Sequence, residues 1–235
     1  MTIKDAPLLP IASELLSKVF KGMNSKGINF IVLRNYKKLP ISWRNDIDIL
    51  VEPNSLDKAH ELILKIFCKS SENITVESLK RYNYRAARCV CLDRTLHIDL
   101  ISHMTKGWFS YANTEVILKA HKKVHPLFNV PDPTHELLLI VAKELFAYGA
   151  IRERYHDRII NVDHDLLYAA ADLIFGGYLS AKGQALILKT FYKPTSKGYP
   201  GIKPSNLLRF NSALCWARMR PNNWEDVILL NKKNT

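Results

Sequence analysis

The stretch RNDIDILV, residues 44–51, places two carboxylates inside an apolar run. Side chains two residues apart on a β-strand project from the same face, roughly 7 Å from each other, so Asp46 and Asp48 share a face while Ile47 and Ile49 point into the core. Like charges this close repel each other and resist the loss of water. A divalent cation would relieve both effects, and Mg²⁺ prefers carboxylate oxygens together with phosphate oxygens from a substrate.

A third carboxylate, Asp99, has a similar setting in LHIDLI, residues 96–101. Leucine and isoleucine side chains occupy the opposite face of that predicted strand. Three acids on two apolar strands are typical of a two-metal phosphoryl-transfer site. Asp46, Asp48 and Asp99 are therefore the candidate catalytic and metal-binding residues, with Mg²⁺ or Mn²⁺ as the cofactor. The alternative is that they are strand-end acids facing solvent and paired with lysine or arginine.

The pattern around these acids predicts alternating helices and strands. Four-residue apolar spacing from Ile11 to Met23 predicts a helix over 10–24 that ends near Gly27, and Leu56, Ala59, Ile63 and Ile66 predict a second helix capped near Asn54 or Ser55. Strands are predicted over 28–35 and 46–51, and further strands, including a hairpin turning at Asp93 and Arg94, over 75–101.

Helical patterns dominate the second half of the chain. A short helix is predicted over 113–123 and a strand or extended link over 125–130. Asp132 and Pro133 begin a longer predicted helix. Further helices are predicted over 162–175, 180–192 and 204–219. We therefore predict an α+β catalytic domain at 1–110, with a mixed β-sheet flanked by helices, and a mainly helical substrate or acceptor domain at 111–235.

This order of elements resembles the nucleotidyltransferase superfamily with the polymerase-β-like fold. The stretch LRNYKKLP (33–40), followed by NDIDILV (45–51), is similar to nucleotidyltransferase-family proteins of bacterial polysaccharide gene clusters. The resemblance covers about residues 10–102. It implies that Asp46 and Asp48 bind the metals, that Asp99 lies near the acceptor hydroxyl, and that the substrates are an NTP and a small-molecule or glycan acceptor.

The sequence departs from this family after the first strand. A Gly-Ser or Gly-Gly pair is expected there, and Arg34 and Asn35 stand in its place. Either these two residues contact the phosphates themselves, as arginine does well, or the donor is not an ordinary NTP. Lys38 and Arg44, in the loop that leads to Asp46, complete the predicted nucleotide-binding set.

A formal net charge of +12 favours an anionic partner. It permits nucleotidyl transfer onto tRNA or protein, although nucleic acid is not the partner we favour, and the missing Gly-Ser pair leaves open a non-catalytic binding module. No run of about 18 uncharged apolar residues and no secretory signal is present, and the four cysteines have neither CxxC nor zinc spacing. These features predict a cytoplasmic protein without a transmembrane segment.

Other polar residues each have a functional and a structural interpretation. His97 shares a face with Asp99 and either contacts the acceptor, acts as a base, or is an ordinary strand residue. Arg152, Arg154 and Arg158 either bind an anionic acceptor or belong to a polar helix end. Tyrosines such as Tyr84 can stack on a base or sugar, but packing is their default role.

Overall fold

The computed structural model describes residues 10–43, 46–70, 74–91, 94–106, 109–192 and 228–230. The chain divides into two compact units. The first contains the described residues between 10 and 102, together with 121–130 and 228–230. The second contains those between 103 and 120 and between 131 and 192.

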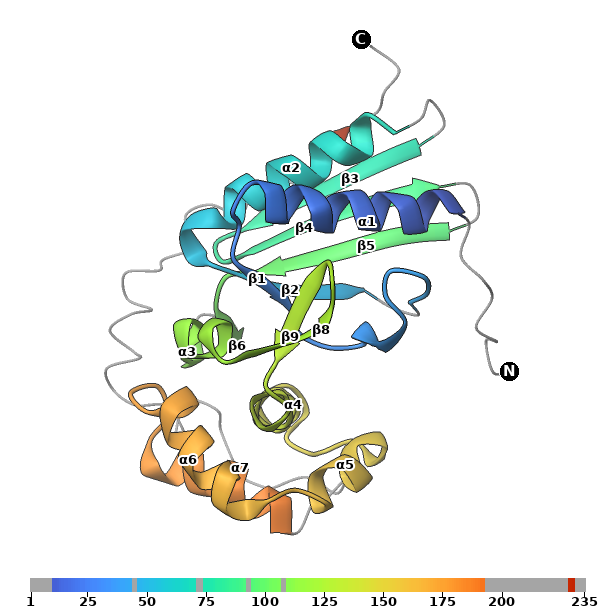
Figure 1. The fold of residues 1–235 in the computed structure, drawn as a ribbon. Helices are drawn as coiled ribbons and strands as arrows, with labels where there is room; N and C mark the ends of the chain where they lie inside the picture. The colour runs from blue at the N-terminus through green and yellow to red at the C-terminus, as the bar shows by residue number, and fades with distance from the viewer. Residues whose placement is uncertain are drawn as a thin grey trace. The chain divides into compact units, whose positions relative to one another are not determined.

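The first unit is built on a mixed sheet with the strand order β10-β3-β4-β5-β2-β1-β9-β8. Figure 1 labels most of these strands, whose bounds are β1 Phe30–Val32, β2 Ile47–Val51, β3 Ile74–Arg81, β4 Tyr84–Cys91, β5 Arg94–Ile101, β8 His121–His125, β9 Phe128–Pro131 and β10 Ile228–Leu230. Strands β3, β4 and β5 form an antiparallel meander. The pairs β2–β5 and β1–β9 are parallel.

Two helices cover one face of this sheet. Helix α1 (Pro10–Ser25) and helix α2 (Leu56–Cys68) lie side by side in front of the strands in Figure 1. Phe20 of α1 packs on Phe30 of β1 and Phe128 of β9, with ring centroids 5.9 and 5.0 Å away. The predicted apolar stripe of α1 is wrong at Ile11, which is 43% exposed. It is confirmed at Leu15, Val19 and Met23, which are at most 2% exposed.

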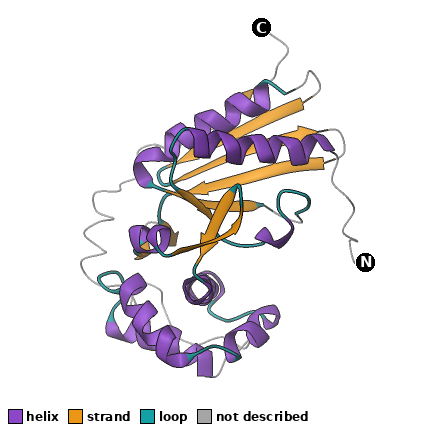
Figure 2. Cartoon of the chain, viewed as in Figure 1, coloured by secondary structure: helices purple, strands orange, loops and turns teal. Residues whose placement is uncertain are grey.

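The second unit is mainly helical, as Figure 2 shows in purple. Its helices are α3 Thr114–Lys119, α4 Pro133–Tyr148, α5 His156–Ile160, α6 His164–Phe175 and α7 Ala181–Tyr192, beside a two-stranded sheet of β6 Met104–Lys106 and β7 Phe109–Ala112. Asp132 caps α4 by accepting a hydrogen bond from the Thr134 N–H at 2.9 Å. Asp163 caps α6 in the same way through the Asp165 N–H at 3.0 Å.

The predicted mixed sheet flanked by helices, with helices later in the chain, is confirmed. The predicted helix over 113–123 is partly wrong, because α3 ends at Lys119 and residues 121–125 form β8 of the large sheet. The predicted helix over 204–219 lies outside the described residues. Among the described helices, none combines the length and the apolar character needed to cross a bilayer.

Candidate functional site

Parallel pairing of β2 with β5 places two of the predicted acids side by side. The register sets Asp48 directly against Asp99. Their neighbours Ile47, Ile49 and Ile98 belong to the hydrophobic core on the other face. The Asp48 side chain is 6% exposed and that of Asp99 15%. Two neighbouring carboxylates are therefore held largely out of solvent on the sheet face opposite the core.

Asp46 joins this pair through a histidine. It lies just before β2 with a side chain that is 53% exposed. His97 of β5 reaches Asp46 Oδ1 with Nδ1 at 2.9 Å and Asp99 Oδ1 with Nε2 at 3.0 Å. The structure thus brings together Asp46, Asp48 and Asp99, and it places His97 between the first and the last.

The two contacts of His97 favour its charged form. Only a protonated imidazole has an N–H on both ring nitrogens, and both nitrogens here face a carboxylate oxygen. The hydrogen bond to Asp99 is the main cause that raises the pKa of His97, although burial of the ring works against it. In its protonated form, His97 is a local cation that links two acids.

Tyr84 fixes Asp99 from the neighbouring strand. In the β4–β5 pair, Ala86 stands opposite Asp99, so Tyr84 is its diagonal neighbour on the same face. The Tyr84 hydroxyl donates a hydrogen bond of 2.6 Å to Asp99 Oδ1. Burial, reinforced by this bond to a carboxylate, raises the pKa of Tyr84 far above its ordinary value. The phenol therefore remains a neutral donor.

Arg34 approaches the site from the end of β1. The Leu33 N–H donates to the Asp48 carbonyl at 2.9 Å, which extends the pairing of β1 with β2 to the residue before Arg34. The guanidinium then forms a hydrogen-bonded ion pair with Asp48 Oδ2. Arg34 is thus in contact with an acid of the candidate site.

Asn35 adopts the backbone conformation that a glycine would favour. Its φ of 59° and ψ of 23° lie in the left-handed region, which asparagine tolerates better than most residues. It precedes the 3-10 turn Tyr36–Lys38, where both Asn35 and Lys38 are exposed. The turn therefore keeps a tight backbone without glycine. Arg44, the remaining predicted nucleotide-binding residue, lies outside the described residues.

The chemistry of these donors fits a hard divalent cation, because three carboxylates stand near one another on two neighbouring strands. Within the described part of the chain, no three His, Cys, Asp or Glu side chains converge as a ready-made metal site. Arg34 and His97 contact carboxylate oxygens that a metal ion would take. Asp46, Asp48 and Asp99 are the residues that would hold the ion.

Two of the predicted arginines of the second unit, Arg152 and Arg158, form ion pairs with buried acids, and Arg154 lies over the Tyr155 ring. Arg152 pairs with Glu144, whose side chain is 1% exposed, and Arg158 pairs at 2.9 Å with Glu136, whose side chain is 6% exposed. Both acids belong to α4, so these contacts tie the segment 152–158 to that helix. This arrangement favours the structural interpretation of Arg152 and Arg158 over an acceptor-binding one.

Sequence patterns had not linked Tyr84 to the acids. The predicted hairpin turn at Asp93 and Arg94 would pair Asp99 with Arg88. The structure pairs Cys91 with Arg94, which sets Asp99 opposite Ala86 and brings Tyr84 to the diagonal position. Searches against protein-family models, curated proteins and solved structures found no significant match to the chain. Support for a function therefore comes from the geometry of the site.

Proposed function

We propose that this chain is a metal-dependent nucleotidyltransferase that moves an NMP from an NTP to a hydroxyl or phosphate of a small molecule or glycan. In the hydroxyl case the acceptor oxygen forms a bond to the α-phosphorus while the bond from that phosphorus to the bridging oxygen breaks. Pyrophosphate leaves with the bridging oxygen, and the hydroxyl proton passes to Asp99.

One observation carries the proposal: Asp48 and Asp99 are register partners on parallel strands, with Asp46 joined to Asp99 through His97. Three carboxylates this close together are electrostatically costly unless cations compensate them. Arg34 and a protonated His97 offset two of the three negative charges, which leaves one for a bound cation. Mg²⁺ or Mn²⁺ bound to these acids would neutralise triphosphate charge and stabilise the departing pyrophosphate.

The other residues have supporting roles in this proposal. Tyr84 and His97 orient the Asp99 carboxylate toward the acceptor, because each is hydrogen-bonded to it. Arg34 turns from Asp48 to the triphosphate when the nucleotide enters, since its planar guanidinium suits phosphate oxygens. Lys38 on the adjacent exposed turn attracts the anionic donor.

The decisive experiment compares the wild-type chain with the double variant Asp46→Asn, Asp48→Asn. Each common NTP is incubated with Mg²⁺ and a panel of sugars, sugar phosphates and polyols, and pyrophosphate release is measured. We expect the double variant to lose at least about a hundredfold in turnover, a loss typical of removing transition-state charge stabilisation. The control is Glu115→Gln, a carboxylate that is 79% exposed on α3 in the second unit.

Turnover by the double variant equal to wild type would show that the mechanism is wrong. The Arg34–Asp48 ion pair favours one second candidate, a non-catalytic nucleotide-binding module of the same fold, because Asp48 already has a cationic partner. Calorimetry separates the two functions. A module would bind an NTP with Mg²⁺ without releasing pyrophosphate for any acceptor, whereas the enzyme would do both.

A further inference from the structure

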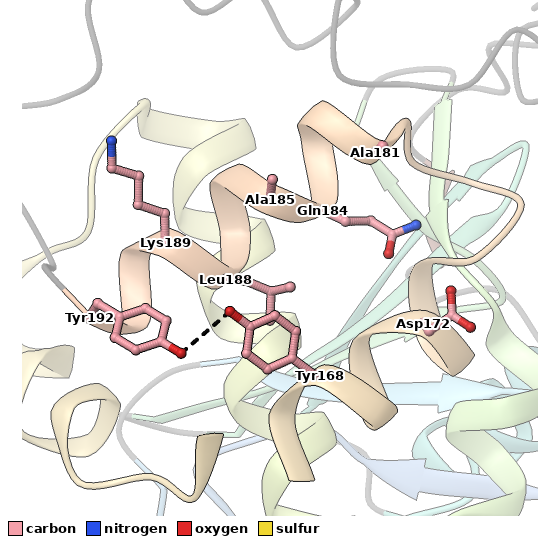
Figure 3. Close-up of a pocket in the computed structure, with 8 residues that line it drawn as sticks. All are labelled: Tyr168, Asp172, Ala181, Gln184, Ala185, Leu188, Lys189 and Tyr192. Carbon is pink, nitrogen blue, oxygen red and sulfur yellow. Dashed lines mark hydrogen bonds between the residues drawn. The ribbon is translucent and has the colours of Figure 1, made fainter. Parts of the chain in front are cut away.

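Helices α6 and α7 of the second unit enclose a surface hollow of about 540 Å³. Tyr168 and Asp172 line it from α6, one turn apart. The lining residues of α7 repeat at three- and four-residue steps from Ala181 to Tyr192, so they form one stripe of the helix. In Figure 3, Leu188 and Tyr168 face each other between the two helices, and Gln184 extends toward Asp172. All the lining residues belong to the second unit, whereas the three acids of the candidate site belong to the first.

The hollow exists because small side chains stand where large ones would fill it. Ala181 and Ala185 occupy two successive turns of α7, and both are exposed. The opposite side of the helix is anchored in the core of the unit, since Ile187 and Phe191 are each 1% exposed. A short side chain on the outer stripe of a well-packed helix leaves a stable concave surface.

One end of the hollow is an aromatic platform. The tyrosine rings remain accessible, with Tyr168 50% and Tyr192 57% exposed. Their hydroxyl oxygens are 3.3 Å apart, which is drawn as the dashed line in Figure 3. His164 stacks on the Tyr192 ring at 4.2 Å between centroids and 8° between planes. These contacts hold the rings in place before any ligand arrives.

The other end is polar. Gln184 and Asp172 lie there together in Figure 3. The Asp172 carboxylate has no side-chain hydrogen bond or ion pair to another described residue, and the same holds for the Lys189 ammonium along the rim. A carboxylate and an amide oxygen are strong acceptors for hydroxyl groups. One acid and one base give the lining no net charge.

We propose that this hollow binds the pyranose ring of a saccharide, with the C–H face of the ring on Tyr168 and Tyr192 and its hydroxyls on Asp172 and Gln184. An open aromatic platform beside hydroxyl acceptors matches a molecule with one apolar face and a polar edge. A nucleotide would bring several negative charges to a lining without net charge, and a lipid chain would leave the polar end unpaired. The inference does not depend on the proposed nucleotidyl transfer.

The test uses the full chain and a panel of methyl pyranosides, namely the glucoside, galactoside, mannoside and N-acetylglucosaminide. Saturation-transfer NMR detects ring protons that touch the protein. At least one pyranoside should give a signal at its ring C–H protons, and Tyr168→Ala and Tyr192→Ala should each weaken its binding at least tenfold. Ala185→Leu fills the hollow while keeping every contacting group, and it should weaken binding to the same extent.

Tyr82→Ala is the matched control, because Tyr82 is a 58% exposed tyrosine of the first unit and is not among the residues that line the hollow. It should leave binding unchanged. Circular dichroism confirms that each variant is folded, which the exposure of the substituted side chains leads us to expect. The proposal is overturned if no pyranoside binds, if binding survives in both tyrosine variants and in Ala185→Leu, or if adenosine binds at the tyrosines and pyranosides do not.

Discussion

Arg34 and Asp48 form the contact that matters most for metal binding. The Asp48 side chain is 6% exposed, and Arg34 is hydrogen-bonded to it. Removing one partner of a buried ion pair leaves an uncompensated charge, which costs about 3–5 kcal/mol. The partial exposure of Arg34, whose side chain is 27% accessible, reduces that cost through solvent screening. A metal ion at Asp48 could replace the guanidinium as the compensating charge.

We therefore predict that Arg34→Ala lowers the melting temperature in metal-free buffer and that Mn²⁺ restores much of the loss. A ligand that binds only the folded state raises the melting temperature by mass action. Because Arg34 no longer competes for Asp48, the Mn²⁺-induced rise should be larger in the variant than in wild type. Thermal denaturation with and without Mn²⁺ measures this difference.

Arg85→Ala is the control for this prediction. Arg85 pairs at 2.8 Å with Asp57, an exposed acid of α2, so its loss removes an ion pair without freeing a carboxylate of the candidate site. Its response to Mn²⁺ should match that of wild type. Equal responses in Arg34→Ala and wild type would argue against competition between arginine and metal.

Local sequence patterns predicted individual strands and helices, but they did not predict which distant strands pair with each other. Alternation in DIDILV predicted the strand β2 with its acids on one face, and the structure has that strand with Ile47 and Ile49 in the core. The neighbour of β2 is β5, which follows a helix and two other strands in the chain. Nothing local encodes such a parallel partner. The contact between His97 and Asp46 depends on this pairing, so local patterns could not predict it. The contact between Tyr84 and Asp99 depends instead on the register of the β4–β5 hairpin.

Helix α2 contains a buried histidine that the apolar spacing did not predict. The apolar spacing omitted His60, yet this residue is fully buried between the helix and the sheet. Its Nε2 lies 3.2 Å from both the Ala86 carbonyl oxygen and the Ser78 hydroxyl. A histidine can complete an apolar face when the sheet offers polar partners, and those partners come from distant strands.

Burial at His60 should make the protein sensitive to acid. Loss of solvent is the main cause that lowers the pKa of His60 below 6.5, so the folded chain holds the ring neutral while the unfolded chain binds a proton. Stability is therefore fully present above pH 6.5, falls as the pH drops from 6.5 toward the lowered pKa, and levels off below that pKa. The loss is about 1.4 kcal/mol for each pH unit over which only the unfolded chain is protonated.

Urea denaturation between about pH 7.5 and pH 5 tests this prediction. Whatever its stability at the upper pH, His60→Phe should lose less on acidification than wild type, because it has no ring nitrogen to titrate. His121→Gln, a change at an exposed histidine of β8, should follow wild type. An equal acid loss in wild type and His60→Phe would assign the effect to other groups, among them His103 and His135, whose pKa values burial also lowers.

The chain does not complete the first unit before it enters the second. It leaves the first unit after residue 102 and returns to it at 121–130, where β9 pairs with β1. The intervening residues 103–120 contribute β6, β7 and α3 to the second unit. Sequence patterns assign residues to helices or strands one segment at a time. They therefore could not predict that residues 121–130 join the sheet formed by earlier strands of the chain.

The net charge of the chain determines how an observed binding to nucleic acid should be interpreted. A net charge of +12 attracts phosphates without any specific site. Non-specific binding through several phosphate contacts falls by about 10³–10⁵ between roughly 50 and 200 mM salt. We predict that a gel shift with tRNA appears at the lower salt and disappears at the higher one. Asp46→Asn with Asp48→Asn should not weaken it, since these changes remove negative charge. A complex that survives the higher salt with one RNA and not with others would instead favour tRNA as the acceptor.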